Sequence, residues 1–298
     1  MFIKEFSEKA FKLGFIATGF SRPKTPLYFE KFTKWINQFE MGDLGYLKRN
    51  LDIRKEPERL LKDLKIVISL AYPYPANKPT TNDGYSAARY SNPTEKDYHI
   101  KMKALGKRLC GLIQSRFPES RSRVCVDSAP ILERSFAAAS GIGFIGKNNM
   151  LIVPEYGSYC FLVEILTTAE FSIPSSHAIE NRCYSCTKCI DSCPSGALKS
   201  PFCLDPSKCF SYLTIEYKGD ITKQTAKKMG NVFFGCDICQ EVCPFNKNGS
   251  PVVCLPASDD IISMDEVDFE SSMGESAFKR AGLQKLQHNI SLIKQTKE

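Results

Sequence analysis

The apolar positions of the first 175 residues follow two spacings, one helical and one typical of short buried strands. Helices are predicted at 2–13, 27–41, 95–116 and 131–140. Short β-rich runs predict strands at 15–19, 65–71, 123–127, 150–153 and 159–166. The polar, turn-rich stretch 76–94 predicts a loop. This mixture indicates an α+β domain with a mixed sheet over residues 1–175.

Seven cysteines form two related motifs that carry the strongest chemical signal in the chain. The first runs Cys183-x2-Cys186-x2-Cys189-x3-Cys193-Pro194, and the second runs Cys236-x2-Cys239-x3-Cys243-Pro244. This is the spacing of bacterial ferredoxins with two [4Fe–4S] clusters, in which the cysteine before proline binds the other cluster. One cluster is therefore assigned to Cys183, Cys186, Cys189 and Cys243. Cys193, Cys236 and Cys239 then bind the second cluster.

The second cluster lacks one thiolate in this assignment, because Phe233 stands where a complete motif has a cysteine. Cys203 and Cys209 are the thiols of the intervening segment. Cys209 is the preferred fourth ligand, since it opens the aromatic-rich stretch 209–216. A structural zinc site also uses Cys-x2-Cys pairs, but zinc takes four ligands. Eight thiolates with two Cys-Pro endings fit two [4Fe–4S] clusters better than zinc.

The cysteine motifs divide the chain into three expected parts. Residues 176–250 predict a ferredoxin-like domain that bound clusters organise more than a hydrophobic core does. Residues 251–298 predict a short helical tail that is acidic at 259–270 and basic from 275 onward. Residues 1–175 are long enough to hold a substrate or cofactor, and the clusters are expected to feed electrons into it.

Asp127 is a candidate catalytic group, because it ends a predicted strand just before a predicted helix. The same position also suits a helix N-cap, which Asp127 or Ser128 would provide equally well. His99 is a candidate ligand or acid, but it lies on a charged helix, so an ordinary, partly exposed histidine is favoured. The run Gly141-Ile-Gly-Phe-Ile-Gly146 follows a helix and precedes a strand, the reverse of the dinucleotide-binding order. Its glycines are therefore expected to let the backbone approach a bulky ligand or to make a tight turn.

The charge and the apolar content of the chain indicate the kind of partner and the cellular compartment. The 298 residues carry a formal net charge of +7, which suits a polyanionic partner. The N-terminus has no apolar signal region, and no apolar run reaches the ~18 residues of a membrane span. We therefore expect a cytoplasmic protein that is not bound to a membrane. Scattered cysteines such as Cys110, Cys125 and Cys160 are expected to be small buried apolar residues.

Taken together, these motifs resemble the epoxyqueuosine reductase family of tRNA-modifying enzymes nearly end to end. The segments that carry the resemblance are Asp127-Ser-Ala-Pro-Ile-Leu-Glu-Arg134, Gly141-Ile-Gly-Phe-Ile-Gly-Lys-Asn148, Tyr156-Gly-Ser-Tyr159, the cysteine run to Leu198, Cys209-Phe-Ser-Tyr-Leu-Thr-Ile-Glu216 and Gly235-Cys-Asp-Ile-Cys-Gln-Glu-Val-Cys-Pro244. Ala88-Arg-Tyr90 and Asp97-Tyr-His99 also fit, although the segment between them departs from the usual form.

The resemblance implies a cobalamin in addition to the two clusters. Asp127 becomes the proton donor of epoxide reduction, and it also faces the cofactor. The other residues that the resemblance places around the cobalamin are Arg54, Tyr90, Ser211, Lys218, Cys236 and Asp237. Many family members continue into a helical-repeat domain, and this chain stops within what resembles its first helix.

The resemblance also implies two partners. One is the anticodon stem-loop of a tRNA, expected at a basic rim formed by Lys218, Lys227, Lys228, Lys279 and Arg280. The other is an external electron donor such as flavodoxin or ferredoxin. Two alternative functions remain open at this point. One is a corrinoid iron–sulfur reductive dehalogenase, and the other is a ferredoxin-type electron-transfer protein without its own substrate.

Overall fold

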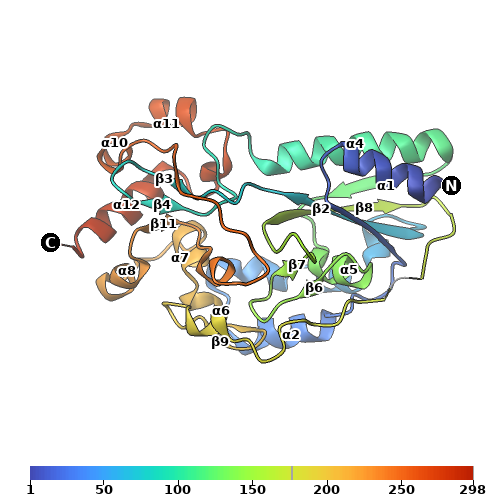
Figure 1. Ribbon diagram of the computed structural model, residues 1–298, viewed down its shortest axis with the longest axis horizontal. Coiled ribbons are helices and arrows are strands. Elements are labelled where there is room, and N and C mark those ends of the chain that lie inside the picture. Colours follow the sequence, from blue (N-terminus) through green and yellow to red (C-terminus); the bar gives the residue numbers. More distant parts are fainter. Residues whose placement is uncertain (176, 298) are drawn as a thin grey trace. The chain divides into compact units, whose positions relative to one another are not determined.

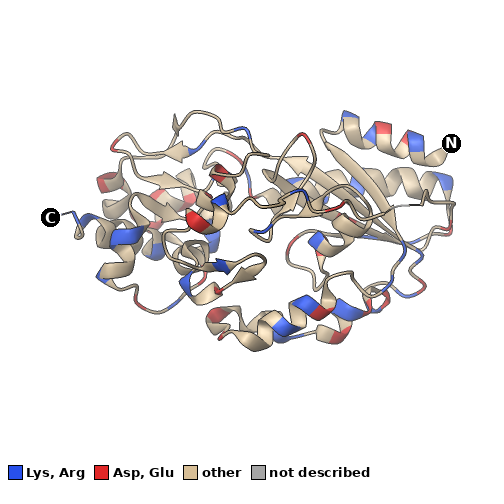
Figure 2. Ribbon diagram, turned by 60° about the horizontal axis from the view of Figure 1, so that its bottom comes forward, with Lys and Arg blue, Asp and Glu red and all other residues tan. Residues whose placement is uncertain are grey.

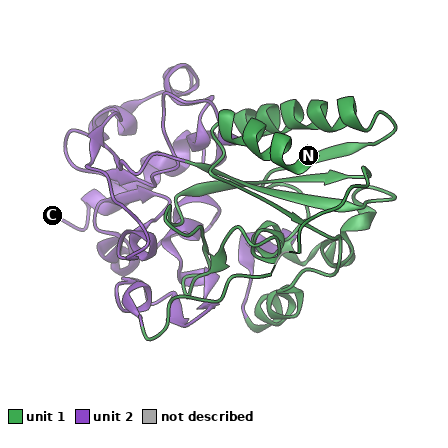
Figure 3. Ribbon diagram, turned by 45° about the vertical axis from the view of Figure 1, so that its right-hand side comes forward, with its two compact units in different colours: residues 1–38, 47–73, 99–185 green, residues 39–46, 74–98, 186–298 purple. Residues whose placement is uncertain are grey.

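The computed structural model describes residues 1–175 and 177–297 and divides into two compact units. Unit 1 comprises residues 1–38, 47–73 and 99–185, and unit 2 comprises residues 39–46, 74–98 and 186–298 (Figure 3). Within the described residues, no helix is both long and apolar enough to cross a bilayer.

Unit 1 is built on a four-stranded sheet with the order β1 (Ala17–Ser21), β2 (Ile66–Pro73), β8 (Cys160–Thr167) and β5 (Ser122–Cys125). All three pairings are antiparallel. The prediction of a mixed sheet in this part of the chain is therefore wrong. Strand direction depends on how the long connections return to the sheet, and a local apolar pattern does not encode that return.

Helices cover both faces of this sheet (Figure 1). On one face lie α1 (Phe2–Lys12), whose Phe6 ring contacts Phe20 of β1, and α4 (Tyr98–Arg116), where Gly106 approaches Val124 of β5. On the other face α5 (Glu133–Ala139) packs against β1, β2 and β8. These helices confirm three of the predicted helical segments, with ends that differ by a few residues.

The remaining elements of unit 1 are short. They are α2 (Phe29–Gln38), α3 (Leu51–Lys55), the 3-10 turn Pro57–Arg59, and a hairpin of β6 (Phe144–Ile145) and β7 (Leu151–Ile152). The hairpin contains the second half of the glycine run. A Cβ at Gly143 would come within 2.6 Å of the Ile152 carbonyl oxygen, so the glycine permits a close backbone approach. This agrees with the expected tight turn.

Unit 2 contains a mixed sheet that the sequence pattern did not predict. Its order is β11 (Val232–Phe234), β4 (Ser86–Ala87), β3 (Pro79–Thr80) and β12 (Val252–Val253). The two outer pairs are parallel and the central pair is antiparallel. The prediction of a loop over 76–94 is therefore wrong in part. These strands are too short to show a period, and their parallel partners lie roughly 145 to 175 residues away in the sequence.

This pairing explains why the compact units do not follow the expected parts 1–175, 176–250 and 251–298. Residues 74–98 group with the cysteine-rich segment because β3 and β4 share their sheet with β11 and β12. The tail belongs to the same unit because its helices complete the core. The helices around that core are α7 (Phe210–Ile215), α8 (Lys223–Met229), α10 (Ser258–Ser263), α11 (Glu266–Ser272) and α12 (Leu283–Lys294).

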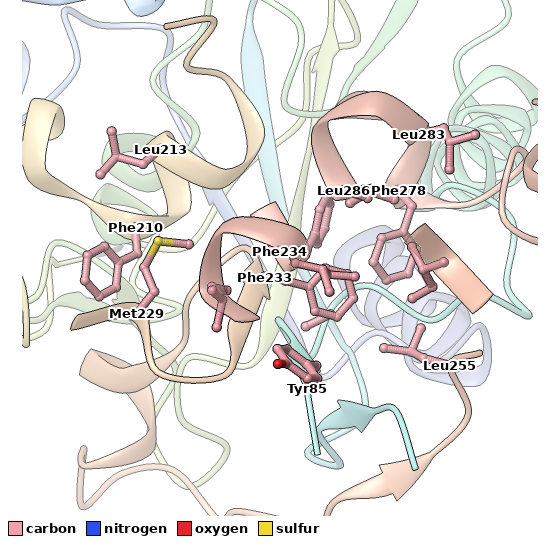
Figure 4. Close-up of a cluster of buried hydrophobic side chains, with 14 of the residues drawn as sticks. Tyr85, Phe210, Leu213, Met229, Phe233, Phe234, Leu255, Phe278, Leu283 and Leu286 are labelled. Carbon is pink, nitrogen blue, oxygen red and sulfur yellow. The ribbon is translucent and has the colours of Figure 1, made fainter. Parts of the chain in front are cut away.

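The core of unit 2 centres on aromatic rings from distant segments (Figure 4). Phe278 lies 4.6 Å from Phe234 and 6.3 Å from Phe233, measured between ring centroids. Asn289 of α12 donates hydrogen bonds to the carbonyl oxygens of Thr214 and Phe233 at 3.0 and 2.9 Å. The tail thus supports the strand that leads directly to the second cysteine motif.

Most of the other elements of unit 2 carry or flank the cysteines: α6 (Lys188–Asp191), β9 (Leu198–Ser200), β10 (Cys203–Leu204), the 3-10 turn Pro206–Lys208 and α9 (Ile238–Glu241). The 3-10 turn Ala277–Arg280 lies in the tail, and the 3-10 helix Gly42–Lys48 lies mostly in unit 2. Helices α6 and α9, one from each cysteine motif, pack together.

Phe278→Ala is expected to destabilise the protein by about 3–5 kcal/mol, because the ring is fully buried and its removal leaves a cavity beside Phe233 and Phe234. Chemical denaturation of purified protein measures the change. Val267→Ala is the control, since Val267 is exposed and the change there should stay within about 0.5 kcal/mol. A loss below 1 kcal/mol for Phe278→Ala would show that the tail does not complete the core.

Candidate functional site

Asp127 lies on a loop between β5 and α5, with its backbone in the left-handed region at φ 52°. Its side chain is 65 % exposed. Helix α5 begins at Glu133, and its N-cap residue is Leu132. The alternative in which Asp127 or Ser128 caps this helix is therefore wrong. Asp127 instead presents a carboxyl group at the surface of unit 1, in a backbone conformation that non-glycine residues seldom adopt.

Two side chains hold Asp127 in this conformation. The backbone N–H of Asp127 donates a hydrogen bond of 2.6 Å to Oε1 of Glu133. The Oδ2 atom of Asp127 lies 3.3 Å from Nε2 of His99, which is 27 % exposed. His99 was expected to be an ordinary histidine, and the structure instead places it beside the candidate acid. The Asp97-Tyr-His99 segment of the resemblance was the signal that pointed to it.

Glu133 belongs to a group of interacting carboxyls behind Asp127. Burial raises the pKa of Glu133 to about 8, and the nearby Asp127 carboxylate raises it further. The Asp127 N–H, Arg134 and His99 act in the opposite direction. Burial also raises the pKa of Glu164 well above its usual value, with Glu133 as the next cause. Two carboxyl groups with raised pKa values therefore lie close to the candidate acid.

Five cysteines of unit 2 lie close enough for their thiols to interact electrostatically. Burial raises the pKa of Cys209, and the neighbouring Cys193 adds to the effect. Burial raises the pKa of Cys236 to about 12, with a further contribution from Cys209. Burial likewise raises the pKa of Cys239 well above its usual value, and Cys236, Cys209 and Cys189 add to it. The structure thus places the four thiols assigned to the second cluster near one another, together with Cys189 of the first set.

Cys203 has a different position, in β10, where it pairs with Ser200 of β9. Of the first ligand set, Cys183 belongs to unit 1, and Cys186, Cys189 and Cys243 belong to unit 2. In the described part of the chain, no three Cys, His, Asp or Glu side chains gather closely enough to hold a single metal ion. A [4Fe–4S] cluster binds its four thiolates through four different irons.

The second cysteine motif is anchored by a buried ion network. Asp237 accepts a hydrogen bond of 2.6 Å from the backbone N–H of Arg89, and both side chains are at most 5 % exposed. Glu241 contacts Arg89 at 2.5 Å and Lys78 at 2.8 Å. Gly235 precedes Cys236 at φ 65°, and a Cβ there would lie 2.5 Å from Cβ of Ala88. Residues 78–89 therefore fix the backbone that carries Cys236 and Cys239.

The remaining residues expected around a cobalamin lie in both units. Arg54, in unit 1, has its guanidinium 5.7 Å from the ring centroid of Phe32. Tyr90 is half-buried against Tyr98 and Phe234. Ser211 is half-buried on α7.

Lys218 is exposed and lines an open cleft of unit 2. The cleft has a volume of about 630 Å³. Its other charged lining residues are Asp43, Glu216, Asp220, Arg280 and Lys285. The backbone N–H of Lys218 donates a hydrogen bond of 2.9 Å to Asp43, which fixes the backbone at this edge of the cleft.

Two family models match this chain, and they fall on the two candidate sites. "Epoxyqueuosine reductase QueG, DUF1730" matches residues 54–128, which end just after Asp127. "4Fe-4S double cluster binding domain" matches residues 182–246, which contain both cysteine motifs. The epoxyqueuosine reductase of Cellulophaga algicola is 33 % identical over 96 % of this chain and 96 % of its own. The chain belongs to the epoxyqueuosine reductase family.

Solved structures of this family share the fold. The epoxyqueuosine reductase of Streptococcus thermophilus matches with a TM-score of 0.88 at 27 % identity, covering 99 % of this chain and 82 % of its own. A second epoxyqueuosine reductase, crystallised with an epoxyqueuosine-modified tRNA-Tyr stem loop, matches with a TM-score of 0.82 at 30 % identity. That match covers 98 % of this chain and 80 % of the other.

Cys209→Ala is expected to halve the iron content of anaerobically purified protein, from about eight to about four atoms, because one [4Fe–4S] cluster loses a ligand. Cys203→Ala is the matched control and should retain both clusters. Iron analysis and electron paramagnetic resonance of the reduced proteins measure the outcome. Loss of a cluster from Cys203→Ala, with Cys209→Ala intact, would reverse the assignment.

Proposed function

We propose that this protein is an epoxyqueuosine reductase, which removes the epoxide oxygen of epoxyqueuosine at the wobble position of tRNA and leaves the alkene of queuosine. The observation that carries this proposal is family membership over nearly the whole length of the chain. The relative crystallised with a modified tRNA stem loop supports the substrate. The position of Asp127, exposed on a loop that two side chains hold, supports the acid chemistry.

The cluster ligands are proposed to be Cys183, Cys186, Cys189 and Cys243 for one cluster, and Cys193, Cys209, Cys236 and Cys239 for the other. The chemistry of the second set fits, because its thiols lie near one another and burial raises the pKa of three of them, Cys209, Cys236 and Cys239. Their protons are released when iron binds, so cluster assembly and folding are coupled. The match to a double-cluster domain supports the count of two clusters.

A cobalamin, when bound, would supply a strongly nucleophilic and reducing cobalt centre, to which the clusters deliver electrons one at a time. Among the residues proposed to hold it, Ser211, Tyr90 and Lys218 fit best, since each presents a polar group from a half-buried or exposed position. Arg54 and Asp127 belong to the same proposal. Asp237 fits less well, because its buried carboxylate already binds Arg89. Cys236 is already assigned to the second cluster. Both are proposed to support the site through the cysteine loop.

Asp127 is the proposed proton donor. Opening an epoxide leaves negative charge on its oxygen, and a carboxylic acid within hydrogen-bond reach supplies the proton that lets the oxygen leave. His99 contacts the side chain of Asp127, and Glu133 accepts a hydrogen bond from its backbone N–H. Together they hold the Asp127 loop. This restraint orients the acid before substrate binds.

The tRNA contact is proposed to use exposed lysines of unit 2. Lys227 and Lys228 are exposed on α8, whereas Lys279 and Arg280 form ion pairs with Glu270 and Glu216 at 3.3 and 2.8 Å. Figure 2 shows Lys and Arg interspersed with Asp and Glu along the chain. The expected basic rim therefore narrows to Lys218, Lys227 and Lys228. A cytoplasmic location and an external donor such as flavodoxin or ferredoxin complete the proposal.

Asp127→Asn is expected to lower turnover of epoxyqueuosine tRNA by about 10²–10⁴-fold, because the amide keeps the shape of the side chain and cannot donate the required proton. Single-turnover assays with chemically reduced protein, analysed as released nucleosides, measure the loss. The visible spectrum should show unchanged cobalamin and cluster bands in both proteins. A spectrum with cluster bands alone would favour the electron-transfer alternative, and wild-type turnover by Asp127→Asn would require another acid.

The double variant Lys227→Glu/Lys228→Glu is expected to weaken tRNA binding and to flatten its dependence on salt, since fewer phosphate charges are neutralised. The slope of log affinity against log salt should fall in magnitude by about 1.5 to 2. Binding of an anticodon stem-loop across a salt series measures both quantities. Lys279→Glu serves as the control, because its charge is already paired. An unchanged slope in the double variant would place the RNA elsewhere.

A further inference from the structure

Four charged side chains of unit 2 form a compact group behind the second cysteine motif, with two cations facing two anions. Asp237 and Glu241 belong to the motif, whereas Lys78 and Arg89 come from residues 74–98. Glu241 lies 2.8 Å from the Lys78 ammonium and 2.5 Å from the Arg89 guanidinium. The Arg89 guanidinium lies 3.7 Å from Asp237, and its backbone N–H donates to the same carboxylate at 2.6 Å. None of these side chains is more than 24 % exposed.

The two carboxylates stand beside proposed ligands of the second cluster. Asp237 directly follows Cys236, and Glu241 lies two residues after Cys239 on the same short helix, α9. Lys78 and Asp237 both lie close enough to the Cys236 thiol to interact with it electrostatically, in opposite directions. Because these groups are largely buried, dissolved salt screens their charges little. The charge balance of the group therefore acts on a cluster held by these thiols.

Stability alone does not account for both cations. Apolar side chains of similar volume often replace a buried ion network without loss of stability. Arg89 has a clear part in holding the backbone, since its Nε also donates to the carbonyl oxygen of Ala76 at 2.8 Å. Among the described residues, by contrast, Glu241 is the one hydrogen-bond partner of the Lys78 ammonium. Lys78 thus adds a positive charge to the group and few restraints.

We propose that Lys78 is a positioning residue that, through Glu241, sets the reduction potential of the second cluster. The proposal rests on the proposed function, which supplies the clusters and their one-electron donor. An electron that enters the cluster adds negative charge beside two carboxylates, and the Lys78 ammonium makes that charge less unfavourable. In this step the flavodoxin- or ferredoxin-type donor loses one electron, the cluster gains one, and no bond forms or breaks.

The competing explanation is that Lys78 only braces α9. Charge-changing variants separate the two roles. Lys78→Met removes the positive charge and keeps an unbranched side chain, and Glu241→Gln removes a negative charge and keeps its shape. The double variant removes both charges, whereas Lys78→Arg keeps the positive one. Lys223→Met is the matched control, since Lys223 is exposed on α8.

Lys78→Met is expected to lower the equilibrium constant for reduction of the second cluster about tenfold, a shift of about 59 mV to more negative potential for one electron. Glu241→Gln should shift the potential in the opposite direction, and the double variant should lie close to the wild type. Lys78→Arg and Lys223→Met should match the wild type. Redox titration followed by electron paramagnetic resonance measures these potentials, after iron analysis has shown about eight iron atoms in each protein.

The Cys209→Ala protein, which is expected to keep the first cluster alone, identifies which potential belongs to the second. A Lys78→Met protein with both clusters and the wild-type potential would overturn the proposal, as would shifts of the same sign in Lys78→Met and Glu241→Gln. Loss of the second cluster from Lys78→Met would show that Lys78 braces the motif, and would overturn it too. If the wild type held both clusters but did not reduce epoxyqueuosine tRNA, the proposed function would fail, and the potentials would still report on Lys78.

Discussion

The burial of ionisable groups is the constraint on which both candidate sites depend. A carboxyl or thiol removed from water holds its proton more tightly, and the structure places such groups at both sites. In unit 2 the thiols of Cys209, Cys236 and Cys239 are buried and mutually interacting, which favours a bound metal cluster that replaces their protons. In unit 1 burial raises the pKa values of Glu133 and Glu164 beside an exposed acid.

The cysteine loops contain little regular structure, so their geometry depends on segments from elsewhere in unit 2. The strand before Cys236 pairs with β4, and the Arg89 side chain bridges Asp237 and Glu241 just after it. Phe234 of that strand packs on Phe278 from the tail. A buried ion network of this kind is costly to break, because loss of one partner leaves the other charge unpaired. The cluster site therefore relies on both early and late parts of the sequence.

Much of the fold was predictable because its signals are local. Helical spacing located α1, α2, α4 and α5 within a few residues, and short apolar runs located the strands of unit 1. The spacing of the cysteines alone predicted the two-cluster domain that the family model matches. The predictions that failed concerned non-local features of the fold. The direction of the strands in unit 1 and the pairing of 79–87 with 232–253 depend on chain paths that no short window contains.

The difference between local and non-local signals also explains which site residues could not be predicted from the sequence. Asp127 was singled out because it ends a predicted strand, and the family resemblance then gave it the role of proton donor. Glu164 was not, since within its own strand it is one polar residue among apolar neighbours. Only the sheet order makes β8 a central strand, and only the packing of α5 makes that face of β8 an interior. A buried glutamate then has no solvent to stabilise its charge. The raised pKa of Glu164 therefore follows from the fold and not from its position in the sequence.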